Sequence, residues 1–292
     1  MTPKATGRRR FMRVVAGTAL ACNSSGLRAQ ETTPINIGLT PVFLDDQITF
    51  LENWQKYLQQ RLQRPIQFFQ RGSYSEVLRL LQNARVDFAW LCGFPYWRNR
   101  DWLKLVAVPV YKGQPLYQAY LIRHVGATNV DKLADLKDKV FAYSDPDSNS
   151  GFLYPQYRLR RAGLDTRRFF ARTFFTWSHR KVVEAVAVQL AHGGAVDGYV
   201  WDVLAQSHPH LTAQTTIFDR STSFGFPPVV AAQHVDATLF NEFQSVLLGM
   251  SDDPEGQKLL QIIMLDGFIQ AKAELFTSIG VMMAEQYHVT PE

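Results

Sequence analysis

The feature that most limits how this chain can fold is a regular alternation of short apolar runs with helical patterns near its start. Residues 35–39, 66–69 and 86–91 are apolar runs of strand length, and the segments between them carry apolar residues at helical spacing. Ser73 and Glu76 form a capping box before the second helical segment. This alternation is typical of an α/β protein with a mostly parallel sheet.

Ligand sites of such sheets lie at the carboxyl ends of the strands. In this chain the strand ends lead into turns at residues 40–41, 72–74 and 92–96. We therefore expect a binding site where these three turns meet.

A second informative stretch is residues 140–155, with the sequence VFAYSDPDSNSGFLYP. It predicts a strand over 140–143, a polar turn, and a helix that begins close to Pro155, because proline is tolerated only near a helix start. The amides of 148–151 are then unpaired and directed outward. Free amides at a helix N-terminus favour an anion or an oxyacid. The alternative is a well-capped loop without a ligand, because serine, asparagine and aspartate also terminate turns.

This stretch resembles the signature of the phosphate, phosphite and phosphonate family of periplasmic solute-binding proteins that serve ABC importers. The family pattern has Ser-Thr-Ser where this chain has Ser148, Asn149 and Ser150, so an amide replaces the middle hydroxyl. The resemblance extends from about Ile35 to the C-terminus. It implies an α/β fold of the two-lobed periplasmic binding protein type 2, with a mixed sheet in each lobe, two hinge crossings and a ligand in the cleft between the lobes.

The resemblance also implies how the chain divides. We expect residues 30–114 and 222–292 to form lobe 1, and residues 115–221 to form lobe 2. The first crossing follows a turn at 112–115, and the return crossing lies within 215–228. The last helices are expected to complete lobe 1.

The implied ligand contacts come from both lobes. His179 follows Ser178 at a predicted helix start, where the helix dipole disfavours an imidazolium, so we expect a neutral imidazole that donates to a bound oxygen. Asp202 ends a predicted strand over 196–202, where it would accept a proton held by the ligand. The alternatives are a capping or surface histidine and a helix N-cap aspartate. The ligand-binding residues implied by the resemblance are Ser148, Asn149, Ser150, Tyr96, His179 and Asp202.

Cys92 is the main departure from the family pattern, which has Gly-Pro at this point. A free cysteine usually behaves as a small buried hydrophobe. The alternative is a soft ligand atom for arsenite, as in the arsenite-binding regulatory branch of this superfamily, whose partner would be a sensor histidine kinase. A third interpretation combines Cys92, His179 and Asp202 as nucleophile, base and orienting group of a hydrolase. We disfavour it because a hinge separates the three and no cysteine-hydrolase signature surrounds Cys92.

Residues 1–29 match the layout of a bacterial twin-arginine export signal. The arginine-rich run 7–13 precedes a weakly apolar run, 14–22, which is too short to span a membrane. Cleavage after Ala29 is expected, and a lipid anchor on Cys22 is the less favoured alternative.

Removal of this segment lowers the formal net charge from +5 to −1, because it holds six basic and no acidic side chains. The basic composition therefore gives no indication of nucleic-acid binding. Cys92 becomes the only cysteine, so no intramolecular disulfide is expected. We expect a periplasmic monomer without catalytic activity, metal or cofactor that binds a small oxyacid and has an ABC permease or a sensor-kinase ectodomain as its partner.

Overall fold

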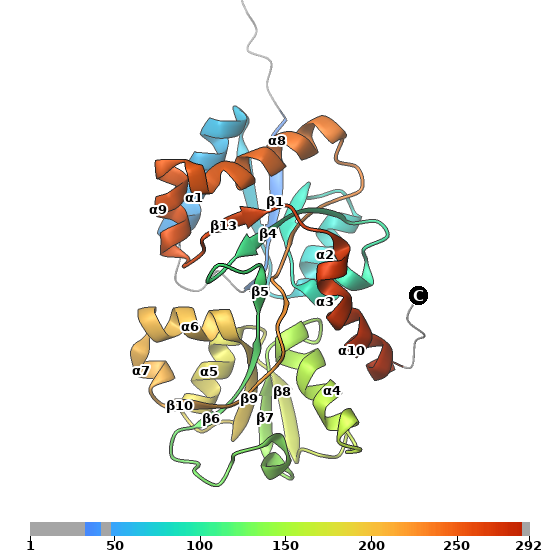
Figure 1. Cartoon of the computed structure of the whole chain (residues 1–292), viewed down its shortest axis with the longest axis vertical. Helices are drawn as coiled ribbons and strands as arrows, with labels where there is room; N and C mark the ends of the chain where they lie inside the picture. The colour runs from blue at the N-terminus through green and yellow to red at the C-terminus, as the bar shows by residue number, and fades with distance from the viewer. Residues whose placement is uncertain (1–32, 42–47, 288–292) are drawn as a thin grey trace, which may run out of the picture. The chain divides into compact units, whose positions relative to one another are not determined.

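The computed structural model describes residues 33–41 and 48–287, which belong to one compact unit of the chain. Two mixed sheets, each packed against helices, form two lobes (Figure 1). The predicted fold class, α/β with a mixed sheet in each lobe, is confirmed. The predicted export signal, its cleavage site and Cys22 lie outside the described residues. Among the described helices, none combines the length and the apolar character needed to cross a membrane.

Lobe 1 is built on a six-stranded sheet with the order β13-β4-β12-β3-β1-β2. β1 is parallel to β2 and β3, whereas β12 and β13 run antiparallel to their neighbours. The elements of this lobe are β1 (Ile35–Leu39), α1 (Ile48–Leu62), β2 (Ile66–Gln70), α2 (Tyr74–Gln82), β3 (Phe88–Trp90), α3 (Gly93–Arg98), β4 (Lys104–Val110), β12 (Val229–Ala231), α8 (Ala237–Leu248), η4 (Gly249–Asp252), α9 (Pro254–Ile262), β13 (Gly267–Ile269) and η5 (Ala273–Phe276).

Lobe 2 is built on a five-stranded sheet with the order β10-β6-β9-β7-β8. β7 is parallel to β8 and β9, and β6 is antiparallel to β9 and β10. The elements are β6 (Ala119–His124), η2 (Leu133–Leu136), β7 (Val140–Tyr143), η3 (Asn149–Leu153), α4 (Tyr154–Arg161), β8 (Arg172–Phe175), α5 (His179–Ala187), β9 (Gly193–Asp197), α6 (Gly198–Ser207), α7 (Pro209–Thr212) and β10 (Thr215–Arg220).

Two chain crossings join the lobes and pair with each other. β5 (Leu116–Tyr117) and β11 (Phe224–Gly225) form a two-stranded antiparallel sheet between the two larger ones. The C-terminal helix α10 (Thr277–Tyr287) follows lobe 1 in the chain but also contacts α4 of lobe 2 (Figure 1). The last helix therefore touches both lobes instead of completing lobe 1 alone.

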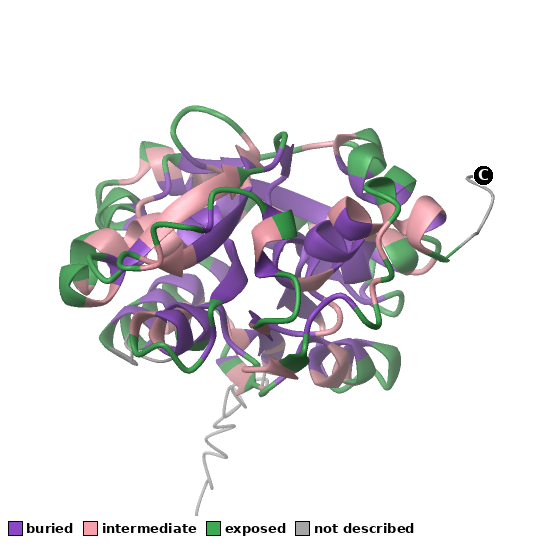
Figure 2. Cartoon of the chain, turned by 90° about the horizontal axis from the view of Figure 1, so that it is seen from below, coloured by how far each residue is buried: buried purple, intermediate pink, exposed green. Residues whose placement is uncertain are grey.

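Buried aromatic side chains fix the strands against their helices. In lobe 1 the Trp54 ring of α1 packs on Phe68 of β2 and Trp90 of β3, with ring centroids 5.3 and 5.9 Å apart. Burying such rings is the main favourable term for a core of this size. Figure 2 shows the resulting arrangement, in which buried strands lie inside and exposed residues lie on the outer helix faces and loops.

The N-terminus of α2 is capped as the sequence predicts, whereas the cap of α6 shows that a predicted strand is too long. The Ser73 hydroxyl accepts from the Glu76 amide (3.3 Å), and the Glu76 carboxylate accepts from the Gly72 amide (3.1 Å). The predicted strand over 196–202 is wrong. β9 ends at Asp197, whose carboxylate caps α6.

Candidate functional site

The loop after β7 and the start of α4 form the centre of the site. Ser148 is the N-cap of η3, a single π-helical turn, and Pro155 lies in the first turn of α4 as predicted. The expectation that the amides of 148–151 are unpaired is wrong for at least three of them. The amide of Ser148 donates to the Asp145 carbonyl (3.0 Å), that of Asn149 to Cys92 Sγ (3.3 Å), and that of Gly151 to Ser148 Oγ (3.0 Å).

Gly151 allows this loop to lie close to its neighbours. A Cβ at this position would collide with Ser144 Oγ and would lie 3.0 Å from His179 Cε1. The residue type is therefore fixed by close approach to both side chains, since φ is not in the left-handed region.

Three buried polar atoms gather around the loop without a hydrogen bond of good geometry. Ser144, Asn149 and Ser150 are each at most 1% exposed, and their Oγ, Oδ1 and Oγ atoms have no hydrogen-bond partner within the described part of the chain. The Ser150 hydroxyl lies near that of Tyr117. A buried polar atom without a partner is costly and typically marks a place where a ligand or water supplies the missing bond. The loop therefore has unused hydrogen-bonding capacity that a polar ligand or water could fill.

His179 is buried and oriented as a donor. Its Nδ1 accepts from the Asp197 amide (3.0 Å), so the neutral ring carries its proton on Nε2, which faces Ser148 Oγ at 3.4 Å. Burial lowers the pKa of His179 to about 3. This burial favours the neutral imidazole that the sequence predicts.

Two buried carboxyls flank this histidine and the loop. Burial raises the pKa of Asp197 to about 7, although its carboxylate accepts from the amides of Tyr199 and Val200. Burial likewise raises the pKa of Asp145 to about 6. Both groups are therefore readily protonated near neutral pH, so they can donate to or accept from a protonated oxyacid.

Lobe 1 closes directly on this loop. The amide of Tyr74, at the start of α2, donates to Asp145 Oδ2 (3.1 Å), and Cys92, the N-cap of α3, accepts from the loop as described above. The Tyr117 hydroxyl, on the crossing strand β5, accepts from Asn149 Nδ2 (2.9 Å). Burial raises the pKa of the Cys92 thiol to about 12, so this sulfur is a neutral thiol at pH 7.

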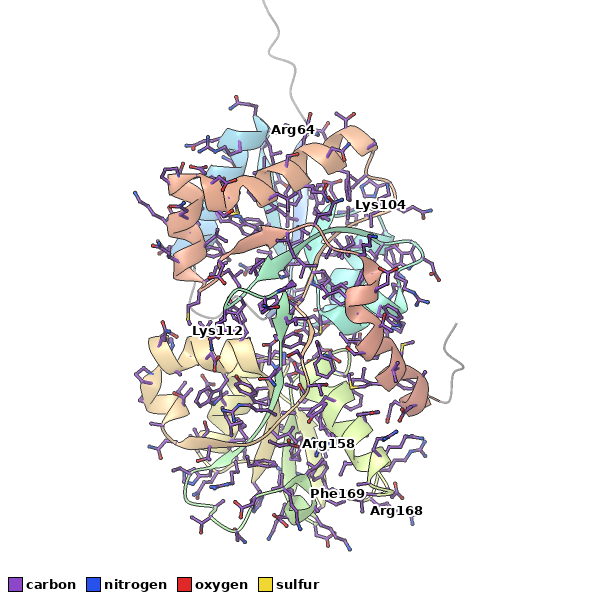
Figure 3. All side chains as sticks on the ribbon, in the orientation of Figure 1. Arg64, Lys104, Lys112, Arg158, Arg168 and Phe169 are labelled. Carbon is purple, nitrogen blue, oxygen red and sulfur yellow. The ribbon has the colours of Figure 1, made fainter. Side chains whose placement is uncertain are left out.

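Two of the predicted site residues have their described contacts outside the loop. The Tyr96 ring packs against Phe276, with centroids 4.9 Å apart, because it is one turn beyond the start of α3 that faces the loop. Asp202 lies within α6 and not at a strand end. Its carboxylate accepts from Tyr111 Oη (2.6 Å) and from Lys112 Nζ (2.7 Å), which is labelled in Figure 3.

The hydrolase interpretation fails for the same reason. His179 Nδ1 is occupied by a backbone donor, so no carboxylate orients this ring. Asp202 is paired with Lys112, and Cys92 faces an amide and not the imidazole. The three residues do not form a catalytic triad.

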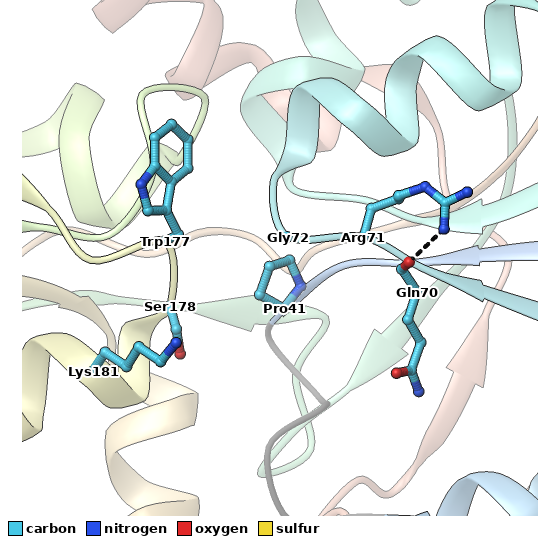
Figure 4. Close-up of a pocket in the computed structure, with 7 residues that line it drawn as sticks. All are labelled: Pro41, Gln70, Arg71, Gly72, Trp177, Ser178 and Lys181. Carbon is cyan, nitrogen blue, oxygen red and sulfur yellow. Dashed lines mark hydrogen bonds between the residues drawn. The ribbon is translucent and has the colours of Figure 1, made fainter.

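Basic side chains lie at the rim of the site, outside the buried loop. A cavity of about 380 Å³ opens between the lobes beside His179. Figure 4 shows residues of the two lobes facing each other across it, with Arg71 on one side and Lys181 on the other. Such charges steer anions toward a cleft. The cavity is lined by Pro41, Gln70, Arg71, Gly72, Trp177, Ser178 and Lys181.

Sequence reasoning missed Ser144, Tyr117 and Asp197 as members of the site. Asp197 was detectable, because the aspartate directly before Gly198 is a good N-cap and favours a shorter strand. Tyr117 carries no local signal, since only the crossing of the chain brings it to Asn149.

Two lobes with mixed sheets, a paired double crossing and a buried polar loop between them define a type 2 periplasmic solute-binding protein. A family model described as the ABC transporter, phosphonate, periplasmic substrate-binding protein matches residues 37–276, and the chain belongs to this family.

Solved structures share this fold. The binding protein component of an ABC phosphonate transporter from Pseudomonas aeruginosa has a TM-score of 0.82 at 20% identity, with 88% of each chain covered. PhnD1 from Prochlorococcus marinus (MIT 9301), solved in complex with methylphosphonate, has a TM-score of 0.77 at 18% identity, covering 88% of this chain and 99% of that chain.

Curated relatives match over shorter lengths. PhnD1, named a probable ABC transporter phosphite binding protein, is 24% identical over 158 residues, 52% of this chain and 53% of its own. The phosphate-import protein PhnD of Mycolicibacterium smegmatis is 28% identical over 162 residues, 51% of this chain and 50% of its own. The chain thus spans about half the length of the curated relatives that it matches.

Proposed function

We propose that this chain captures a small phosphorus oxyacid, namely a phosphonate, phosphite or phosphate, between its lobes and delivers it to an ABC importer. The observation that carries the proposal is the group of three buried polar atoms of Ser144, Asn149 and Ser150 that have no hydrogen bond of good geometry to any described residue and lie near the His179 donor. The oxygens of a small oxyacid can accept from the two serine hydroxyls, and an oxygen that keeps its proton can donate to Asn149 Oδ1.

The two buried carboxyls of Asp145 and Asp197 indicate which protonation state of the ligand the site favours. A fully ionised dianion would be repelled by two carboxylates, whereas a ligand that keeps a proton, or meets a protonated Asp197 or Asp145, avoids this repulsion. The family relatives named for phosphite and phosphate, and the one solved with methylphosphonate, are consistent with this class.

The remaining parts of the proposal concern location and partners. The protein acts in the periplasm as a monomer, after export through a twin-arginine-type signal in residues 1–29. Its partner is the permease of the importer. The arsenite-sensing alternative with a sensor-kinase partner is not favoured, because the family match is to phosphonate-binding proteins and the Cys92 thiol is buried, protonated and engaged by an amide.

Titration calorimetry with methylphosphonate, phosphite, phosphate and arsenite tests the proposal. We expect saturable binding of at least one phosphorus oxyacid, and a ligand at 100 times its Kd should stabilise the protein by about 2.7 kcal/mol. Ser150→Ala should weaken binding by about 1–3 kcal/mol, because an oxygen of the ligand loses a buried donor.

Ser148→Ala is the matched control, because Ser148 Oγ caps η3. It should lower the melting temperature of the unliganded protein, whereas Ser150→Ala should leave it nearly unchanged. Arsenite binding that disappears in Cys92→Ser, with no binding of any phosphorus oxyacid, would overturn the proposal.

A further inference from the structure

A second cavity is lined by residues of lobe 2, including Phe152 of η3, and by the end of α10. Its volume is about 580 Å³, within the range of about 300–1,000 Å³ typical of small-molecule sites. It is bounded by α4, by edge strand β8 with the segment that precedes it, and by the end of α10. None of its lining residues lines the cavity between the lobes.

The floor of this cavity is aromatic and already assembled. The Phe152 ring lies 5.2 Å from Tyr143 and 5.5 Å from Phe175, measured between centroids, and Phe170 lies 6.3 Å from Tyr143. Tyr143 is held in turn by the Gln156 amide, which donates to its hydroxyl (2.6 Å). Phe152 and Phe175 are only partly buried and therefore offer ring surface to a ligand.

The walls are basic. Arg160, Arg167 and Arg172 line the cavity, and none of the described residues that line it is an aspartate or a glutamate. The neighbouring arginines 158, 161 and 168 each lie within ion-pair distance of a carboxylate, whereas Arg167 and Arg172 form no ion pair with any described residue. Figure 3 shows Arg158 and Arg168 on this lobe. Two exposed guanidinium groups that are not paired with a carboxylate of residues 33–41 or 48–287 are suited to bind an anion in a bidentate manner.

We propose that this cavity is a second ligand site that takes an aromatic compound carrying a phosphate group. The ring would lie on the Phe152 and Phe175 surface, and the phosphate would lie between Arg167 and Arg172. A bare oxyanion satisfies only the arginines, and an uncharged aromatic compound satisfies only the floor. The site is therefore selective for a molecule that combines both groups. Binding at this site does not require the oxyacid proposed for the cleft.

Titration calorimetry with adenosine monophosphate as the probe tests this inference. All titrations contain excess methylphosphonate, so that the cleft between the lobes is occupied. We expect saturable binding of adenosine monophosphate that is about tenfold or more tighter than the binding of adenosine or of inorganic phosphate. The variant Arg167→Gln/Arg172→Gln should lose about tenfold or more in affinity. Both side chains are exposed, so melting temperatures should not change.

Arg168→Gln is the matched control, because Arg168 lies next to Arg167 but does not line the cavity. It should keep wild-type affinity. The inference is overturned by an equal loss in Arg168→Gln, which indicates non-specific attraction to basic charge. It is overturned as well by competition from methylphosphonate, which places the probe in the cleft, or by the absence of saturable binding. The single variants Arg167→Gln and Arg172→Gln show how much each arginine contributes to the affinity.

Discussion

His179 and Asp197 show how burial sets the chemistry of individual residues in this protein. The imidazole accepts from the Asp197 amide, and the same burial that lowers the histidine pKa to about 3 raises the aspartate pKa to about 7. Both groups are therefore neutral in mildly acidic solution. This favours hydrogen bonding over ion pairing as the mode of ligand recognition.

The raised pKa of Asp197 predicts a pH-dependent stability. The folded-state pKa of Asp197 lies above the ordinary value of 3.8. The contribution of Asp197 to the free energy of unfolding is therefore fully present below about pH 4 and is lost as pH rises toward 7. Asp197→Asn keeps a capping side chain but does not titrate. The wild type should therefore lose stability relative to this variant between pH 4 and 7.5, by an upper bound of about 4 kcal/mol.

Chemical denaturation of both proteins at several pH values measures this difference. His179 and Asp145 titrate in both proteins, so their contributions largely cancel. A constant difference in the free energy of unfolding across this pH range would show that Asp197 is ionised in the folded protein.

At the scale of elements, the site depends on how β7 leads into α4. At the π-helical turn η3, Ser148 lies close to His179 of α5, and Gly151 makes this approach sterically possible. The single extra residue of a π turn is a frequent device at functional sites. The loop thus relies on one small residue as much as on its polar ones.

Gly151→Ala tests this dependence. The added methyl group would displace Ser144 and press against His179, so we expect a loss of about 1–3 kcal/mol in stability and a marked loss of oxyacid affinity. Gly163→Ala is not a suitable control because its φ of +71° would strain alanine, whereas Gly249 has open space. Gly249→Ala should leave affinity unchanged. Wild-type affinity in Gly151→Ala would show that the loop adapts freely.

At the scale of the whole unit from residue 33 to residue 287, contacts across the lobes hold the site closed. Asp145 accepts from the Tyr74 amide, and Arg98 of lobe 1 forms an ion pair with Asp147 of lobe 2 at 2.9 Å. On the opposite side of the loop, Arg160 of α4 donates to Gln286 of α10 (3.2 Å). Hydrogen bonds and an ion pair between the lobes therefore stabilise the closed arrangement without a ligand.

We predict that removing the first two contacts opens the unliganded protein. Asp145→Ala and Arg98→Gln should each increase the radius of gyration measured by small-angle scattering, and methylphosphonate should reverse the increase. Arg61→Gln, which removes an ion pair within lobe 1, should not change it. An unchanged radius in both cross-lobe variants would indicate that α10 and the crossing strands determine closure.

The sequence by itself determined the fold class, the loop at 148–150 and the role of Pro155. These features depend on local properties, namely apolar periodicity, turn residues and the missing N–H of proline. They can therefore be predicted without a structure. His179 was also found, because serine before a helix start is a local signal and the family motif includes the pair.

The tertiary structure decided which side chains share the site. Asp202 was expected from the family resemblance and from a strand over 196–202, and only the capping of α6 shows that the strand ends at Asp197. Tyr96 was expected from the family resemblance, whereas no pattern along the chain reveals that the crossing brings Tyr117 to Asn149. The physical reason is that burial, and with it the pKa values and unmet hydrogen bonds of the site, arises only when two lobes distant in sequence close on one loop.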